Sequence, residues 1–218
     1  MIARIAAAAL VVSMGLGAQP VANRSEDLKP ATVGVTLTFD GKPSRGFVKS
    51  LRQEVASLFR PTGLDLRWQI LERGTKPGVY DRAVVLRMKG RCNASAVYDA
   101  TREPQARRTL GETIISDGEV LPIVVVNCDE IARAVSDLRF QAVGPLALPN
   151  VHLRLTARVV AHELLHALLK NPDHQETDCA KALLRPADLL SVARLSAGEV
   201  AELQKIGRPS SVGILAER

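Results

Sequence analysis

The stretch Val159-Val160-Ala161-His162-Glu163-Leu164-Leu165-His166-Ala167-Leu168-Leu169 decides the fold of this chain. Apolar residues fill most of its positions, which predicts a helix that is buried on nearly all of its faces. Three ionisable side chains, His162, Glu163 and His166, stand inside this apolar run. Such groups are costly to bury unless something satisfies them, and a metal ion does so. The stretch therefore predicts a buried helix with a metal site.

The spacing of the histidines indicates which metal and which chemistry. Four residues advance about 400° around a helix, so His162 and His166 project from one face and can reach one Zn²⁺. Glu163 can then act on a water at the metal as a general base. Three protein ligands plus water form the catalytic type of zinc site. The alternative is an ordinary buried helix in which hydrogen bonds satisfy the histidines.

The third ligand is expected soon after the helix. Asn171 tolerates the left-handed conformation at a helix end and Pro172 cannot continue a helix, so the helix should stop near Lys170 and let His174 return to the metal. The other candidates for this ligand are Asp173, Asp178, Cys179 and Glu199. Residues 196–199 fit a capping box, which favours a structural role for Glu199 at the start of its own helix.

The pattern H-E-x-x-H-x7-H resembles that of the metzincin clan of zinc metallopeptidases. It is most similar to bacterial secreted metzincin-like proteins of the form H-E-L-x-H-x-L-L-G-x-x-x-H. The matching positions are His162, Glu163, Leu164, His166, Leu168, Leu169 and His174. Lys170 stands where that form has glycine, and no methionine follows the motif to form the methionine turn of the clan. The resemblance covers roughly residues 157–206.

This resemblance implies an α+β fold with a twisted mixed sheet, a central HExxH active-site helix and a helical C-terminal half. It implies an endopeptidase in which His162, His166 and His174 bind Zn²⁺ and Glu163 is the general base. The partner would be a peptide or protein substrate, bound as an added strand at a sheet edge. The missing methionine and Lys170 favour the alternative, a non-catalytic zinc-binding secreted domain.

Periodicity predicts the elements around the motif. Strands are expected over residues 33–39, 64–70, 83–88, 112–115 and 120–127. Helices are expected after caps at Ser44, Asp129 and Ser196, and a further helix from Pro186. Residues 116–118 are expected to turn a hairpin, the apolar run 121–126 to form a central strand, and residues 144–149 to form a loop before the motif helix. Strands followed by helices are typical of an α+β layout.

The ends and the cysteines indicate export. Residues 1–18 read as a signal peptide, residues 19–30 as a flexible lead-in and residues 31–218 as one domain. We therefore expect a secreted or periplasmic protein that leaves the membrane after cleavage. In an oxidising compartment one disulfide is expected, with Cys92–Cys128 favoured because both follow predicted strands and Cys179 left over. His152 reads as an ordinary loop or helix-end residue.

The charge distribution argues against nucleic-acid binding. The formal net charge is +6, but charges of both signs alternate along the chain and no basic tract is flanked by aromatic residues. Aromatic residues make up only 3% of the chain, so the core must depend on Leu, Val, Ile and Ala.

Overall fold

The computed structural model describes residues 30–71, 76, 78–93, 95–99, 109–138, 147–173 and 193–206. The predicted signal peptide, almost all of the lead-in, the helix expected from Pro186 and the predicted ligand His174 lie outside these residues. Asp178 and Cys179 lie outside them as well, so these expectations remain predictions. None of the described helices combines the length and the apolar character needed to cross a bilayer.

The described strands form one mixed sheet, as predicted. They are β1 (Thr32–Phe39), β2 (Asp65–Ile70), β3 (Arg82–Lys89), β4 (Gly111–Ser116) and β5 (Glu119–Asn127). Their order is β2-β1-β3-β5-β4. Neighbouring strands are parallel except for β4, which pairs with β5 in the antiparallel direction and lies at one edge. Residues 121–126 lie in β5, which pairs with β3 on one side and β4 on the other, so the prediction of a central strand is confirmed: β5 is an interior strand, although β3 occupies the middle position.

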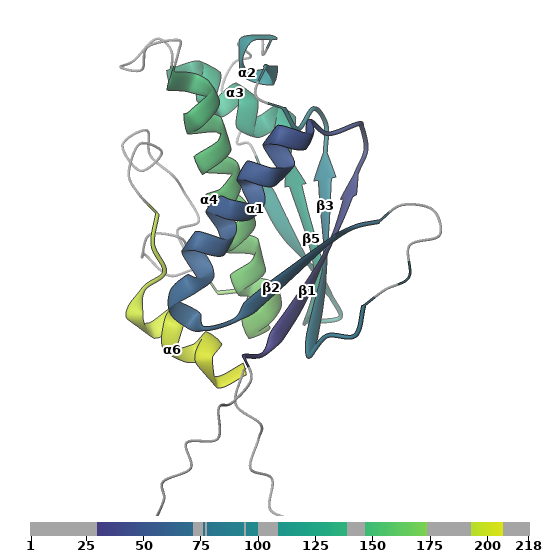
Figure 1. Cartoon of the computed structure of the whole chain (residues 1–218), viewed down its shortest axis with the longest axis vertical. Helices are drawn as coiled ribbons and strands as arrows, with labels where there is room; N and C mark the ends of the chain where they lie inside the picture. The colour runs from purple at the N-terminus through teal and green to yellow at the C-terminus, as the bar shows by residue number, and fades with distance from the viewer. Residues whose placement is uncertain are drawn as a thin grey trace, which may run out of the picture.

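The described helices are α1 (Arg45–Phe59), the 3-10 helix η1 (Arg60–Thr62), α2 (Ala96–Asp99), α3 (Cys128–Leu138), α4 (Leu148–Leu169) and α6 (Ala197–Ile206). Helices α1 and α4 lie side by side along one face of the sheet (Figure 1). The strands alternate accordingly: Val84, Leu86 and Met88 of β3 are buried under the helices, whereas Val85 and Arg87 on the other face are exposed.

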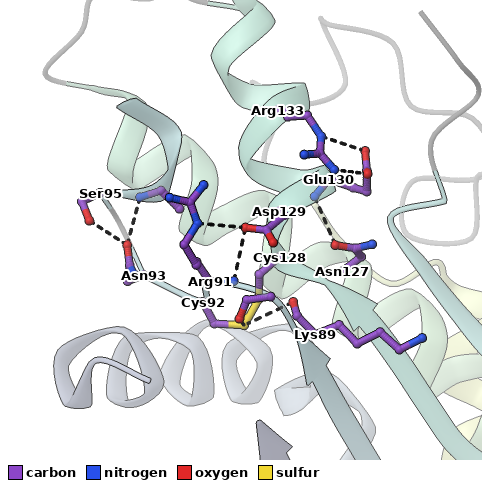
Figure 2. Close-up of polar contacts among 12 residues, drawn as sticks. Lys89, Arg91, Cys92, Asn93, Ser95, Asn127, Cys128, Asp129, Glu130 and Arg133 are labelled. Carbon is purple, nitrogen blue, oxygen red and sulfur yellow. Dashed lines mark hydrogen bonds and ion pairs between the residues drawn. A yellow bond between two sulfur atoms is a disulfide. The ribbon is translucent and has the colours of Figure 1, made fainter. Parts of the chain in front are cut away.

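Three helix boundaries differ from the predictions, whereas each strand boundary agrees to within one residue. Helix α4 starts at Leu148, inside the expected loop. Pro149 lies in its first turn, where a backbone N–H would have no acceptor within the helix, so the missing N–H of proline costs nothing. It ends at Leu169, and Lys170 rather than Asn171 takes the left-handed conformation, with φ 51°. Helix α3 starts at Cys128, so Asp129 is not its cap. The cap is the side-chain oxygen of Asn127, which accepts a hydrogen bond from the Glu130 N–H at 3.3 Å (Figure 2).

The predicted disulfide Cys92–Cys128 is present, with the two Cα atoms 5.1 Å apart. It ties the segment that follows β3 to the first residue of α3 (Figure 2). Beside it, the guanidinium Nε of Arg91 lies 3.3 Å from a carboxylate oxygen of Asp129. Asp129 therefore pairs with the neighbouring segment in place of the capping role predicted for it.

Candidate metal and catalytic site

The motif residues lie in the second half of α4, in the interior of the protein. Glu163 is 5% exposed and His166 is 9% exposed, whereas the side chain of His162 is 12% exposed. Helix α4 packs against α1 on one side and against β4 and β5 on another. The apolar residues of the motif supply this packing, and Glu163 and His166 border β4.

The two histidines converge on one point. Their Nε2 atoms are 3.1 Å apart, and their rings meet edge to face with centroids 4.7 Å apart. Two nitrogens that each lie about 2.0–2.1 Å from one Zn²⁺ at the tetrahedral angle are roughly 3.3–3.4 Å apart. The observed separation is close to this value, so these two side chains fit as ligands of a single zinc ion.

The end of α4 fixes the ring of His166. Its Nδ1 lies 2.6 Å from the backbone oxygen of Asn171, which can only accept a hydrogen bond. Nδ1 therefore carries the proton and Nε2 keeps a lone pair for a metal, the arrangement found around zinc-binding histidines. Asn171 directly follows Lys170, which ends α4 in the left-handed conformation.

Glu163 is held between the histidines and the edge strand. Its Oε1 lies 4.0 Å from Nε2 of His162, and its Oε2 accepts a hydrogen bond of 2.7 Å from the hydroxyl of Thr113 in β4. Burial raises the pKa of Glu163 above its usual range. The hydrogen bond from Thr113 opposes this shift, as does His166 whenever its ring is protonated, whereas the negative charge of Glu112 adds to it.

Strand β4 approaches α4 closely beside this carboxylate. A Cβ on Gly111 would lie 2.6 Å from Cγ1 of Val159 and 2.9 Å from Cγ of Glu163, so only glycine fits there. A pocket of about 210 Å³ opens between strand and helix, and Glu163, His166, Ile115 and Val120 line part of it. The pocket places a small space with both polar and apolar walls directly beside the candidate base.

The structure tests only part of the predicted ligand set. Within the described residues no three His, Cys, Asp or Glu side chains gather as a metal site, and His174 is not among these residues. Asp173 is described and is exposed. Glu199 forms the predicted capping box, in which its carboxylate accepts from the Ser196 N–H at 2.5 Å and its own N–H donates to the Ser196 hydroxyl. That confirmed role removes Glu199 from the ligand candidates.

Thr113, Gly111 and Asn171 were not identified from the sequence. Thr113 meets Glu163 from fifty residues away in the chain, and only the fold brings them together. Gly111 offered one signal, because a glycine at the start of a strand often marks a close backbone approach. Asn171 acts through its backbone carbonyl, which no side-chain pattern reveals.

The interpretation of His152 as a loop or helix-end residue is wrong. It lies in the second turn of α4, is 0% exposed and stacks at a tilt on Phe47 with ring centroids 5.6 Å apart. Burial lowers its pKa to about 4, and the backbone of Cys128 opposes this shift without forming a hydrogen bond of standard geometry. His152 is thus a neutral core residue, separated from His162 by nearly three helical turns.

No model of a protein family and no curated protein sequence matches this chain. Among solved structures, the chain is similar to an archaemetzincin from Methanopyrus kandleri, with a TM-score of 0.47 and 13% identity over 82% of this chain and 96% of that chain. It is also similar to a chain in the GM1-bound form of the ECX AB5 holotoxin, with a TM-score of 0.42 and 11% identity over 83% and 82% of the two chains. Because both TM-scores lie below 0.5, we base the proposal that follows on the side chains of α4 and β4.

Proposed function

We propose that this protein is an exported zinc-dependent endopeptidase of the metzincin type. The observation that carries the proposal is the convergence of His162 and His166 on one point, with Glu163 beside them in a buried, partly apolar setting. His174 would complete the ligand set from the segment after α4. When bound, Zn²⁺ would act as a Lewis acid toward the scissile carbonyl and lower the pKa of a water to near neutrality.

The protein side chains would then move the proton. Glu163 would accept a proton from the attacking water and donate it to the leaving amine. A carboxylate with an ordinary pKa is a weak base at neutral pH, and the burial that raises the pKa of Glu163 makes it a stronger one. A purely structural zinc site has no use for a base at this position.

The substrate would lie along β4. This strand is an edge of the sheet, and the face of β4 that points to α4 borders the pocket beside Glu163. An extended peptide that pairs with the side of β4 on which no described strand lies would place its scissile bond near the histidines, and backbone hydrogen bonds would hold it with little dependence on its sequence. Hydrolysis outside the cytoplasm, in the periplasm or beyond the cell, would follow from the signal peptide predicted for residues 1–18.

The test measures zinc per chain and hydrolysis of a peptide library, using protein purified without chelator. We expect close to one zinc in the wild type and a sharp loss in His162→Ala, His166→Ala and His174→Ala. Glu163→Gln should keep zinc and lose hydrolysis by about 10²- to 10⁴-fold. A wild type without zinc, even after metal is added back, would overturn the proposal.

The rival function is zinc binding without catalysis, and the lack of any methionine after the motif favours it. It predicts stoichiometric zinc in the wild type and in Glu163→Gln, with no peptide cleaved by either protein. Full activity in Glu163→Gln would instead show that hydrolysis does not use this carboxylate.

A further inference from the structure

The edge strand β4 contacts the candidate base with two residues on a single face. Gly111 pairs with Val126 and Thr113 pairs with Val124 in the sheet register, and both valines are fully buried under the helices. Residues two apart on a strand point to the same side. Gly111 and Thr113 therefore both face α4, and they meet it at Glu163.

Thr113 binds Glu163 at two atoms. Its hydroxyl oxygen lies 2.7 Å from Oε2 of the carboxylate and 3.0 Å from the backbone oxygen of the same residue. The hydroxyl has one hydrogen to donate, and a charge-assisted bond to a carboxylate is the stronger of the two. The backbone oxygen of Glu163 is thus the alternative acceptor for the same hydrogen.

Gly111 makes the contact possible. A side chain at this position would collide with Val159 and with Cγ of Glu163 at distances below 3.0 Å, so any larger residue would push the strand away from the helix. The missing side chain lets Thr113 come within hydrogen-bond distance of the carboxylate. Gly111 and Thr113, which we call the cradle, thus together hold Glu163.

The cradle makes the two carboxylate oxygens different. Oε2 is bound by Thr113, whereas Oε1 is the oxygen placed 4.0 Å from Nε2 of His162. A glutamate side chain has several rotatable bonds and, without a partner, samples several rotamers. Binding one oxygen orients the other toward the point where the histidines converge.

We propose that Thr113 is a positioning residue that fixes the rotamer of Glu163, so that Oε2 anchors the side chain and Oε1 exchanges the proton with water. This inference rests on the proposed peptidase function and adds to it the residue that aims the base. It also gives β4 a second role, because the strand proposed to bind the substrate is the strand that holds the base.

The test compares Thr113→Val, which keeps the shape of the side chain and removes the hydroxyl, with Thr113→Ser, which keeps the hydroxyl. Thr36→Val is the matched control, since Thr36 lies on β1 between the core residues Val35 and Leu37 and so faces away from α4. Each protein is measured for zinc per chain, for kcat and KM on the best library peptide, and for the Glu163 rotamer in a crystal structure.

We expect all three variants to keep zinc. Thr113→Val should lower kcat by about 10- to 100-fold with KM nearly unchanged, because a misplaced base slows the chemical step and not substrate binding. Its crystal structure should show Glu163 turned away from His162. Thr113→Ser should stay within about threefold of the wild type, and Thr36→Val should match it.

Two results would overturn the positioning role. One is a Thr113→Val protein with the wild-type rotamer and the wild-type kcat; the other is a Thr113→Ser protein that loses as much kcat as Thr113→Val, which would show that keeping the hydroxyl is not enough to preserve activity. If the wild type cleaves no peptide, the peptidase proposal fails separately. The crystal structures of the variants then still decide whether Thr113 sets the position of Glu163.

Discussion

Lys170 ends α4 in a conformation that suits glycine better than lysine. Its φ of 51° lies in the left-handed region, where a Cβ costs roughly 1–2 kcal/mol. Lys170→Gly removes this cost but adds freedom to the unfolded chain, so we expect the free energy of unfolding to rise by about 0.5–1 kcal/mol. Urea unfolding measures it.

The matched control is Lys49→Gly in the interior of α1, where glycine should lower stability by about 1 kcal/mol. A lower free energy of unfolding in Lys170→Gly would contradict the prediction. It would mean that the lysine side chain stabilises the fold by more than its left-handed backbone destabilises it. Zinc content should not change, because the carbonyl of Asn171 that orients His166 remains in place.

His152 should make the protein less stable in acid. The unfolded chain binds a proton on this ring with a pKa near 6.5, whereas the buried ring does so only near 4. Between these two pKa values the unfolded state binds more protons than the folded state. Burial of the neutral His152 ring therefore costs no stability above about pH 6.5, and the free energy of unfolding falls as the pH falls toward 4. At pH 5 the loss amounts to about 2 kcal/mol.

The measurement is the free energy of unfolding of the wild type and of His152→Leu at pH 7 and pH 5. The wild type should lose about 2 kcal/mol more than the variant over this interval. The raised pKa of Glu163 makes the folded state more stable as the pH falls, the opposite of the effect of His152. Because Glu163 is present in both proteins, its effect cancels when they are compared. Equal losses in the two proteins would show that His152 is protonated as easily in the folded state as in the unfolded one.

The sequence predicted which motif residues make up the candidate site, but not which residues outside the motif support them. His162 and His166 could be paired from their spacing, because the geometry of a helix is fixed and local. The support from Thr113 depends on which strand lies at the sheet edge and on its register, and both are set by contacts far apart in the chain. His152 was misread because nothing in its neighbours distinguishes a helix end from a second turn.

At the scale of elements, the β4–β5 hairpin shows how a proline fits inside a sheet. Thr113 pairs with Val124 and Ile115 pairs with Val120, so β5 has three residues where β4 has one. Pro122 lies within this bulge, and the pairing of β5 with β3 begins only at Ile123. No ladder position therefore needs the N–H that proline lacks.

The apolar run 121–126 read as a central strand because a strand buried on both faces is continuously apolar. Val124 and Val126 face the helices and are fully buried, whereas on the other face Val125 is 8% exposed and Ile123 is 37% exposed. The run therefore identified β5 as a strand with a neighbour on each side, but hydrophobicity alone could not give its place in the strand order. The strands and helices themselves were predictable, since their periods appear directly in the sequence.

The start of α3 gives a test of the corrected cap. The side chain of Asn127 accepts a hydrogen bond from the Glu130 N–H, so Asn127→Ala should lower the free energy of unfolding by about 1 kcal/mol. Asn127→Asp keeps an acceptor at the same position and should be within a few tenths of the wild type. Thermal or urea unfolding of both variants decides. Equal stability of Asn127→Ala and the wild type would mean that another group caps the helix.

At the scale of the whole molecule, the helices α1 and α4 and the sheet share one core. Val35 and Leu37 of β1, Leu51 of α1 and Leu164 of α4 all belong to it and are fully buried. Helix α4 touches α1, β4 and β5, so the residues that build the core also hold the histidines in place. The site consequently depends on the stability of the whole domain.

The disulfide should contribute a large part of that stability. Cys92 and Cys128 are 36 residues apart, and closing a loop of this length restricts the unfolded chain by about 3–4 kcal/mol in the chain-entropy model. Most domains of this size have a free energy of unfolding of only about 5–15 kcal/mol. We therefore expect reduction of Cys92–Cys128 to lower the midpoint of urea unfolding substantially.

The experiment compares the Cys179→Ala protein, oxidised and reduced, with a Cys92→Ala/Cys128→Ala protein. Replacing Cys179 removes the remaining thiol, so that no exchange with it alters the pairing. The reduced and the doubly substituted proteins should agree and fall about 3–4 kcal/mol below the oxidised one. A protein that depends on this bond reaches full stability only in an oxidising compartment, as the proposed export requires. Equal stability of the oxidised and reduced forms would show that the fold does not need the disulfide and would contradict its use as support for export.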